Sequence, residues 1–213
     1  MEQKELIQQF RIQAKEKNLA KIKDLVLIQC QNYLEKENSV NNKFIVDSGN
    51  EQAIDLIISY FFRLDEFEKF GGTFDKGLLL KGNPGVGKDM MMDVMASIFS
   101  FQVTDVDHLD RIYMIKGIEA LDAYGELRNN LIHIQDIGNE NEKTYHYQQP
   151  LNTVDWVIRG SYKIFLSKGI KIHISSNLDD KQRKQMYGER LNSRMDQMFN
   201  HIIFKGNDRR VVN

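Results

Sequence analysis

The segment from Gly77 to Met91 reads GLLLKGNPGVGKDMM. Its three consecutive leucines predict a short buried strand, and the glycines and proline after them predict a turn. The run from Met90 to Phe99 then has the apolar character of a helix. Glycines in such a turn let successive backbone N–H groups point at phosphate oxygens, and a helix N-terminus adds partial positive charge. The order strand, turn, helix therefore predicts a phosphate-binding loop.

We expect this loop to bind ATP with Mg²⁺. Lys88 would reach the outer phosphates as a point charge. The position after the lysine normally holds a Ser or Thr that ligates magnesium, but here it is Asp89. A carboxylate is a stronger magnesium ligand, yet it lies close to the nucleotide's own charge, so it either has a function or weakens binding. The expected nucleotide contacts are Gly82, Asn83, Pro84, Gly85, Val86, Gly87, Lys88, Asp89 and Met90.

The rest of the chain alternates short apolar runs with longer runs of helical period. This pattern predicts an α/β fold in which helices cover a parallel sheet in three layers. With only two prolines, both in predicted loops, nothing interrupts the scheme. Five strands are expected, at Gly77–Lys81, Gln102–Val106, Asn130–Gln135, Ile170–Ser175 and Ile202–Lys205. Helices are expected to begin near Gly87, Lys116, Leu151, Asp180 and Glu189.

The first 70 residues predict a helical extension of the nucleotide-binding core at 71–213. Apolar residues up to position 36 form a narrow helical stripe that includes Ile22, Leu25, Val26 and Tyr33. Residues 35–50 are rich in Asn and Ser and predict a loop, and a second helix is expected from Gln52 to Leu64. The stripe either binds a partner protein or packs on the chain's own core.

Composition excludes several classes of protein. At 213 residues and 41% hydrophobic content, the chain can bury one sizeable core. Cys30 is the single cysteine, which excludes an intrachain disulfide and a multi-cysteine zinc site. No stretch of about 18 apolar residues or secretion signal is present, so we expect a soluble, cytoplasmic protein that does not enter membranes.

Charge is unevenly spread along the chain. The formal net charge is -1, but residues 159–213 carry 12 Lys or Arg against 5 Asp or Glu. This surplus of seven positive charges indicates either an anionic partner, such as single-stranded DNA, or a functionally idle basic surface.

A second set of candidate residues follows the third expected strand, in Leu131-Ile132-His133-Ile134-Gln135-Asp136-Ile137-Gly138. This segment resembles the AAA+ helicase-loader and transposition-helper ATPases (DnaC-like and IstB-like), of the additional-strand class of P-loop proteins. Their strand ends in two acids, the first holding the metal and the second orienting the attacking water. Here Gln135 replaces the first acid, and Asp136 matches the second.

Two departures from the family pattern therefore concern the metal. Because Asp89 adds a carboxylate where Gln135 removes one, we hypothesise that the metal-binding acid has moved to the phosphate loop. The metal ligands would then be Asp89 and Asp136. The alternative is a slow or inactive ATPase that binds nucleotide as a switch.

Three further segments resemble the same family of ATPases. Lys171-Ile172-His173-Ile174-Ser175-Ser176-Asn177 is similar to the strand that ends in a polar sensor, although Asn177 could instead cap the next helix. Tyr187-Gly188-Glu189-Arg190-Leu191-Asn192-Ser193-Arg194 resembles the family's Tyr-Gly-x-Arg-x-x-Ser-Arg. It implies Arg194, or alternatively Arg190, as the arginine that acts on a neighbouring subunit's nucleotide. The ending resembles Gly-x-Ser-x-Arg, which implies Arg210 over the phosphates, with Asp208 replacing the serine.

The resemblance implies a function and its partners. It implies an ATPase that assembles as a homo-oligomer, with ATP between subunits, and loads a replicative helicase onto single-stranded DNA. No separate C-terminal lid domain is expected, and residues 1–70 would bind the helicase. A transposition helper that binds a transposase, and a hydrolysis-poor nucleotide-binding regulator, are the alternatives.

Overall fold

The computed structural model describes residues 9–10, 13, 15–37, 43–125 and 132–210. This part of the chain forms two compact units. The first unit comprises the described residues of 1–74, 83–100 and 202–213, and the second comprises those of 75–82 and 101–201. The predicted phosphate loop belongs to the first unit from Asn83 onward. Each unit is described below by itself.

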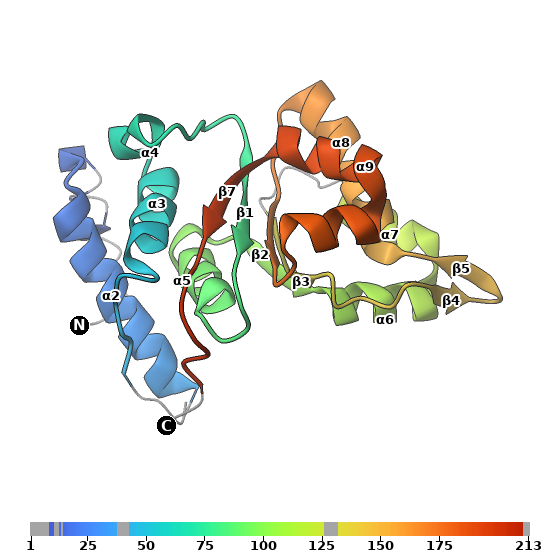
Figure 1. Ribbon diagram of the computed structural model, residues 1–213, viewed down its shortest axis with the longest axis horizontal. Coiled ribbons are helices and arrows are strands. Elements are labelled where there is room, and N and C mark those ends of the chain that lie inside the picture. Colours follow the sequence, from blue (N-terminus) through green and yellow to red (C-terminus); the bar gives the residue numbers. More distant parts are fainter. Residues whose placement is uncertain (1–8, 11–12, 14, 38–42, 126–131, 211–213) are drawn as a thin grey trace. The chain divides into compact units, whose positions relative to one another are not determined.

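A five-stranded sheet confirms the predicted α/β fold (Figure 1). Its order is β2-β3-β6-β1-β7, and the pairs β1–β6, β2–β3 and β3–β6 are parallel. Leu78, Leu79 and Leu80 are fully buried, as expected for a central parallel strand. The strands are β1 (Gly77–Lys81), β2 (Gln102–Asp105), β3 (Ile132–Ile137), β6 (His173–Ser176) and β7 (Phe199–Ile203).

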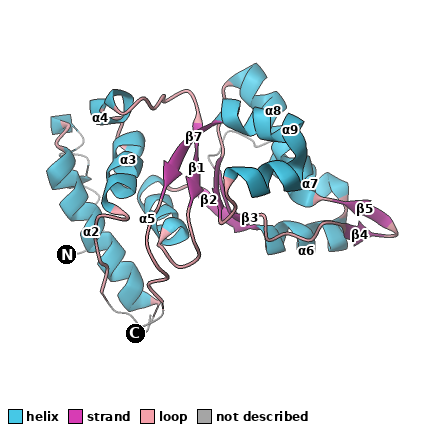
Figure 2. Ribbon diagram, in the orientation of Figure 1, coloured by secondary structure: helices cyan, strands magenta, loops and turns pink. Residues whose placement is uncertain are grey.

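Four helices and a hairpin complete the second unit (Figure 2). The helices are α6 (Val106–Lys116), α7 (Ile118–Gly125), α8 (Thr153–Lys168) and α9 (Asp180–Met198), and the hairpin joins β4 (Thr144–His146) to β5 (Gln149–Leu151). Strand residues such as Ile134 and Ile174 share one buried cluster with Ile158 of α8 and Leu191 of α9. Side-chain caps at Asn152 and Asp179 define where α8 and α9 begin.

The first unit is helical. It contains α2 (Leu19–Lys36), α3 (Glu51–Phe61), α4 (Asp65–Lys69) and α5 (Lys88–Phe99). Ile22, Leu25 and Val26 of the predicted stripe are buried, because α2 packs on α3 and α5 within this unit. The Tyr33 hydroxyl also donates a hydrogen bond to Asp93 of α5, at 2.9 Å. The described residues of the stripe are therefore used largely by the chain's own core, and residues 1–8, 11–12 and 14 lie outside the described part.

Several predicted boundaries were wrong. The strand expected to reach Val106 ends at Asp105, whose side chain caps α6 by accepting a 2.7 Å hydrogen bond from the amide of His108. Helix α6 and the β4–β5 hairpin were not predicted. The last strand begins at Phe199 rather than at Ile202, and β3 continues past Gln135 to Ile137. Residues 130 and 131, expected to begin that strand, lie outside the described residues.

The helix boundaries near Gly188 were predicted more closely. Expected helix starts at Asp180 and near Glu189 correspond to one helix, α9, broken at Gly188, where φ is 74° and ψ is 164°. No helix in the described part of the chain combines the length and the apolar character needed to cross a membrane.

A buried histidine, His173, predicts acid sensitivity. His133 and His173 are register partners on β3 and β6, and both are fully buried. His173 Nδ1 accepts a 2.9 Å hydrogen bond from the amide of Leu78, and burial holds the pKa of His173 well below its usual value. The neutral ring is therefore preferred in the folded state, whereas the unfolded chain takes up a proton near pH 6.5.

The contribution of His173 to the free energy of unfolding should then be fully present above about pH 6.5. Below that pH it should fall by about 1.4 kcal/mol per pH unit. Urea unfolding at a series of pH values measures the slope. A His173→Gln variant should lose this part of the dependence. Equal slopes in the variant and the wild-type chain would contradict the assignment.

Candidate nucleotide site

The phosphate loop has the backbone that the sequence predicted. Strand β1 ends at Lys81, and α5 begins at Lys88. Between them Gly82, Gly85 and Gly87 have φ values of 151°, 72° and 98°, a region in which side chains other than hydrogen are strained. Glycine at such positions permits the tight turn from which backbone amides can bind a phosphate.

Lys88 lies within the loop that it would serve. It is only 3% exposed, and its Nζ donates a 3.0 Å hydrogen bond to the carbonyl oxygen of Asn83. Because a buried ammonium requires partners, this carbonyl stabilises the side chain at the loop. A phosphate oxygen bearing negative charge would be a stronger acceptor for the same ammonium.

Arg209, which is far from the loop in sequence, forms hydrogen bonds with it. The backbone amide of Arg209 donates to the carbonyl of Gly85 at 3.1 Å, and its guanidinium donates to the carbonyl of Val86 at 2.7 Å. The same guanidinium pairs with Asp47 at 2.8 Å and lowers the pKa of that carboxyl. Arg209 therefore joins the loop to residues before α3, a role the sequence did not suggest.

Arg210, predicted to lie over the phosphates, makes an ion pair beside the loop. Its guanidinium contacts Asp208 at 2.7 Å, and hydrogen bonds from Arg210 lower the pKa of Asp208 to about 2. A Cβ placed on Gly85 would lie 1.7 Å from the Asp208 carboxylate, so this acid rests directly against the loop. Since Arg210 is largely exposed, it could exchange this partner for a phosphate without breaking the core.

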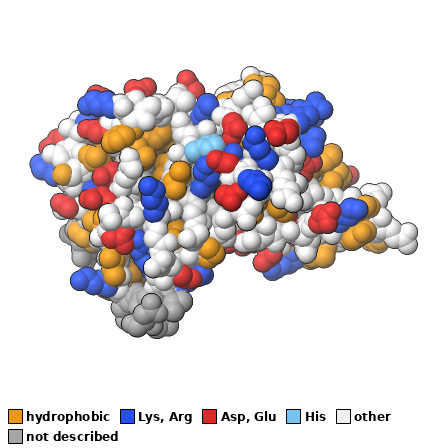
Figure 3. Space-filling view, in the orientation of Figure 1, with side chains coloured by type: hydrophobic (Ala, Val, Ile, Leu, Met, Phe, Trp, Pro, Cys, Tyr) orange, Lys and Arg blue, Asp and Glu red, His pale blue; other side chains and the backbone are white. Residues whose placement is uncertain are grey.

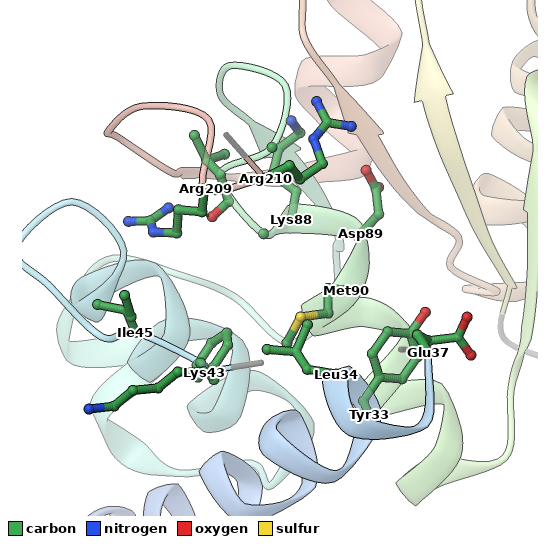
Figure 4. A pocket seen from close by; sticks show the side chains of 14 residues that line it. Tyr33, Leu34, Glu37, Lys43, Ile45, Lys88, Asp89, Met90, Arg209 and Arg210 are labelled. Atoms are coloured by element: carbon green, nitrogen blue, oxygen red, sulfur yellow. The ribbon is translucent and has the colours of Figure 1, made fainter. Parts of the chain in front are cut away.

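A cavity of about 380 Å³ opens beside the loop, entirely within the first unit. Figure 4 shows Lys88, Asp89 and Arg210 at one end, and Tyr33 and Leu34 of α2 at the other. The first end carries charged side chains next to the loop backbone, and the other end combines aromatic and aliphatic side chains with Glu37 and Lys43. The lining residues are Tyr33, Leu34, Glu37, Lys43, Phe44, Ile45, Gly85, Val86, Gly87, Lys88, Asp89, Met90, Arg209 and Arg210.

This division suits a nucleotide, which has a flat, weakly polar base at one end and phosphates at the other. Of the predicted contacts, Gly85 to Met90 and Arg210 line this cavity. The sequence did not single out the lining that comes from α2 and from residues 43–45. The sequence predicted the first segment as a helix that binds a partner or packs on the core, and residues 43–45 as part of a loop, with no role in binding a nucleotide.

The second unit brings two other predicted residues together. Asn177, which directly follows β6, donates a hydrogen bond from its Nδ2 to Oδ1 of Asp136 at 3.3 Å. The Asp136 amide donates to Ser175 Oγ at 3.1 Å, and the β3–β6 register shifts between Ile134 and Ile137. Asp136 itself has φ of 59°, which is rare for a non-glycine residue. Such local strain is typical of functional positions.

The two predicted finger arginines lie on α9, after its break at Gly188. Arg190 is exposed. Arg194 is half-buried, and its guanidinium carbon lies 4.9 Å from the ring centre of Tyr162, a cation–π contact. Arg194 also lines a second cavity of about 580 Å³, together with Trp156, Arg159 and Lys163.

The face seen in Figure 3 is not uniformly basic. Over α8 and α9, the face seen in Figure 3 mixes Lys and Arg with Asp and Glu side chains. One such contact joins Lys184 Nζ and Glu189 at 3.5 Å. The surplus of positive charge in residues 159–213 is therefore partly offset locally on this face.

Acidic and histidine side chains do not gather into a metal site of their own in the described part of the chain. Within the described ranges, no group of three or more His, Cys, Asp or Glu side chains could hold a metal ion. A magnesium ion would therefore take most of its ligands from phosphate oxygens and water, as is usual for this ion. Asp89 lines the cavity beside the loop, within the first unit.

Comparisons with known proteins bear on the fold. No protein-family model matches the sequence, and no curated protein matches it. Among solved structures, the DnaC helicase loader is 18% identical with a TM-score of 0.56, over 82% of this chain and 99% of that one. A putative primosome component from Streptococcus pyogenes serotype M3 is 15% identical with a TM-score of 0.56, over 85% and 97%.

A third similar structure is AMPPCP-bound DnaA from Aquifex aeolicus, 15% identical with a TM-score of 0.52, over 78% of this chain and 50% of that chain. At these identities the similarity concerns the arrangement of the backbone. Together with the order of the strands in the sheet, it shows that this chain shares the α/β fold of the DnaC helicase loader and of DnaA.

Proposed function

We propose that this protein is an ATP-binding accessory protein of DNA replication, similar to a helicase loader. The observation that carries the proposal is the cavity in which the glycine-rich loop and Lys88 face apolar residues of α2 and of segment 43–45. The fold shared with the DnaC helicase loader and with a putative primosome component supports the choice of process.

In this proposal ATP would bind with its phosphates on residues 82–88 and its base toward Tyr33 and Phe44. Lys88 would exchange the carbonyl of Asn83 for phosphate oxygens, and Arg210 would exchange Asp208. Both exchanges replace an internal partner by a more highly charged one, which favours the bound state. Met90 and Asp89, in the first turn of α5, complete the predicted contacts.

For hydrolysis, we propose roles for the residues that the sequence singled out after the third and fourth predicted strands. Asp136 would orient and activate the attacking water, and Asn177, already hydrogen-bonded to it, would hold that carboxylate in place. Arg194, or Arg190 in its place, would act on the nucleotide of a neighbouring copy in a homo-oligomer. Magnesium would neutralise phosphate charge. Asp89 would serve as its carboxylate ligand, because Gln135 stands where similar ATPases have the metal-binding acid.

The metal-site hypothesis is tested by Asp89→Thr, which restores the usual hydroxyl. If Asp89 is the relocated ligand, magnesium-dependent ATP turnover should fall about 10-fold or more in the variant. Steady-state phosphate release, measured with and without magnesium, reports the change. Turnover near zero in the wild-type chain that rises in Asp89→Thr would instead support a hydrolysis-poor nucleotide switch.

Single-stranded DNA is the proposed nucleic-acid partner, and the hairpin offers a place to stack bases. Tyr147 at its turn is 90% exposed and Tyr145 is 57% exposed. The Tyr147 ring meets that of His146 at 4.5 Å, edge to face, and His146 Nδ1 lies 3.0 Å from the carbonyl oxygen of Met114. An exposed aromatic ring held in this way can stack on a base of any sequence.

Replacing Tyr147 with alanine is therefore expected to weaken binding to oligo-dT by between about 5-fold and about 100-fold, the usual contribution of one stacked base. Fluorescence anisotropy with labelled oligo-dT measures the affinity. Leu166→Ala removes another exposed apolar side chain, on α8, and should leave binding unchanged. If both variants bind as the wild-type chain does, the hairpin is not a DNA contact.

The proposed protein partner is a replicative helicase in the cytoplasm, bound through residues 1–70. Size-exclusion chromatography of the purified chain with the replicative helicase from the same host, with and without ATP, tests this. A complex that forms with the helicase but not with a transposase supports the loader. The reverse preference would support the transposition helper, which the core residues alone do not distinguish.

A further inference from the structure

A buried contact between Glu140 and Tyr187 lies beside the strand end that carries Asp136. Tyr187 Oη donates a 2.5 Å hydrogen bond to Oε1 of Glu140, and the amide of Gly138 donates a 2.6 Å hydrogen bond to Oε2. Glu140 is 6% exposed and Tyr187 is 9% exposed. Both carboxylate oxygens are thus occupied, and burial raises the pKa of Glu140.

A carboxylate is a costly way to fill such a position, because a packed apolar residue would avoid its desolvation. A carboxylate, unlike an apolar side chain, accepts hydrogen bonds from defined directions. Its two oxygens join the amide of Gly138, two residues after Asp136, to one specific hydroxyl on α9. A Cβ on Gly138 would lie 2.6 Å from Leu178, the residue after Asn177, so this corner is tightly packed.

Tyr187, the partner of Glu140, lies beside the break in α9. Tyr187 directly precedes Gly188, whose φ of 74° and ψ of 164° interrupt the helix. Residues after Gly188 include Arg190 and Arg194 and are joined to the first half of α9 through a residue without helical geometry. A hydrogen bond at Tyr187 therefore fixes the orientation from which the arginine-bearing half leaves.

We propose that Glu140 and Tyr187 are positioning residues, which couple the Asp136–Asn177 strand end to the arginine-bearing half of α9. This inference deepens the proposed function and rests on it for the role of Arg194. A change at the strand end would pass through Gly138 and Glu140 to Tyr187 and then move Arg194. All of these residues belong to the second unit.

The chain carries its own reporter for this movement. Trp156 is the single tryptophan, is 37% exposed, and lines the same cavity as Arg194, Arg159 and Lys163. Iodide, an anionic quencher, is attracted by these cations, so quenching of Trp156 depends on where Arg194 lies. An Arg194→Gln variant calibrates the reporter and should lower the quenching constant.

The test is Tyr187→Phe, which removes the hydroxyl and keeps the buried ring. We expect the iodide quenching constant of Trp156 to change by at least half as much as in Arg194→Gln. We also expect kcat for ATP to fall about 10-fold with KM unchanged, because nucleotide binding uses other residues. Tyr113→Phe is the matched control. It loses a similar 2.9 Å hydrogen bond, from its buried tyrosine to the carbonyl of Gln149, and should change neither quantity.

Glu140→Gln keeps an acceptor for Tyr187 but not for both donors, so it should change the quenching constant by an intermediate amount. The double variant Glu140→Gln, Tyr187→Phe should change the quenching constant by less than the sum of the two single changes. Wild-type quenching in Tyr187→Phe would overturn the inference, as would an equal change in Tyr113→Phe. The quenching measurement needs no turnover. Absence of ATP hydrolysis in the wild-type chain would therefore count against the proposed function, while quenching still decides whether Tyr187 positions Arg194.

Discussion

Replacing Lys88 with alanine is expected to weaken ATP binding about 100-fold, the usual loss when a charge-assisted contact to a phosphate is removed. The ammonium is held at the loop by the carbonyl of Asn83 and is almost completely buried. No other lysine is part of the loop, and Lys43 lies at the other end of the cavity (Figure 4). Isothermal titration calorimetry of the variant and the wild-type chain measures the difference.

Lys205→Ala is the matched control for Lys88→Ala. It removes the same charge from an exposed side chain of the same unit, outside the cavity lining. Its ATP affinity should equal that of the wild-type chain. A similar loss in both variants would indicate a general effect of net charge rather than a contact made by Lys88.

Replacing Asp136 with asparagine is expected to lower ATP turnover between about 100-fold and about 10,000-fold, the range for loss of a general base. The amide keeps the shape of the side chain, including an oxygen that can accept the hydrogen bond from Asn177. ATP affinity should stay within about 3-fold of the wild-type value, because nucleotide binding uses the loop. Single-turnover hydrolysis, together with the binding titration, separates the two effects.

Asp107→Asn is a suitable control for Asp136→Asn, since it neutralises an exposed acid in the first turn of α6. Turnover in this variant should be unchanged. An Asp136→Asn variant that hydrolyses ATP at the wild-type rate would show that Asp136 does not take part in hydrolysis.

The part of the fold that could be predicted from sequence was the part with strong local signals. Leu78 to Leu80 and the glycines after them have few alternative structures, and both were placed correctly. Helix α6 was missed because Val106 was taken as the end of a strand, although Asp105 could have been recognised as an N-cap. The hairpin was missed because Tyr147 and Gln148 adopt positive φ values without the Gly or Asn that usually marks such a turn.

The candidate site was predictable where it follows the chain and unpredictable where distant segments meet. Residues 85–90 could be proposed from the sequence because a phosphate loop is contiguous, and the structure shows that they line one cavity. Tyr33 and Phe44 were not proposed, since Tyr33 reaches the cavity through the packing of α2 on α5, and Phe44 lies after α2, where its amide donates a 3.0 Å hydrogen bond to Gln31. Arg209 was overlooked in favour of its neighbour because only the structure shows which of the two donates to the loop carbonyls.

Titration of the intact wild-type chain with ATP and magnesium tests the central claim most directly. The loop, Lys88 and the apolar end of the cavity predict saturable binding of one ATP per chain, with a Kd between about 1 µM and about 1 mM, the common range for such substrates. Calorimetric heats that show no saturation up to several times that upper limit would contradict the claim that this cavity binds a nucleotide.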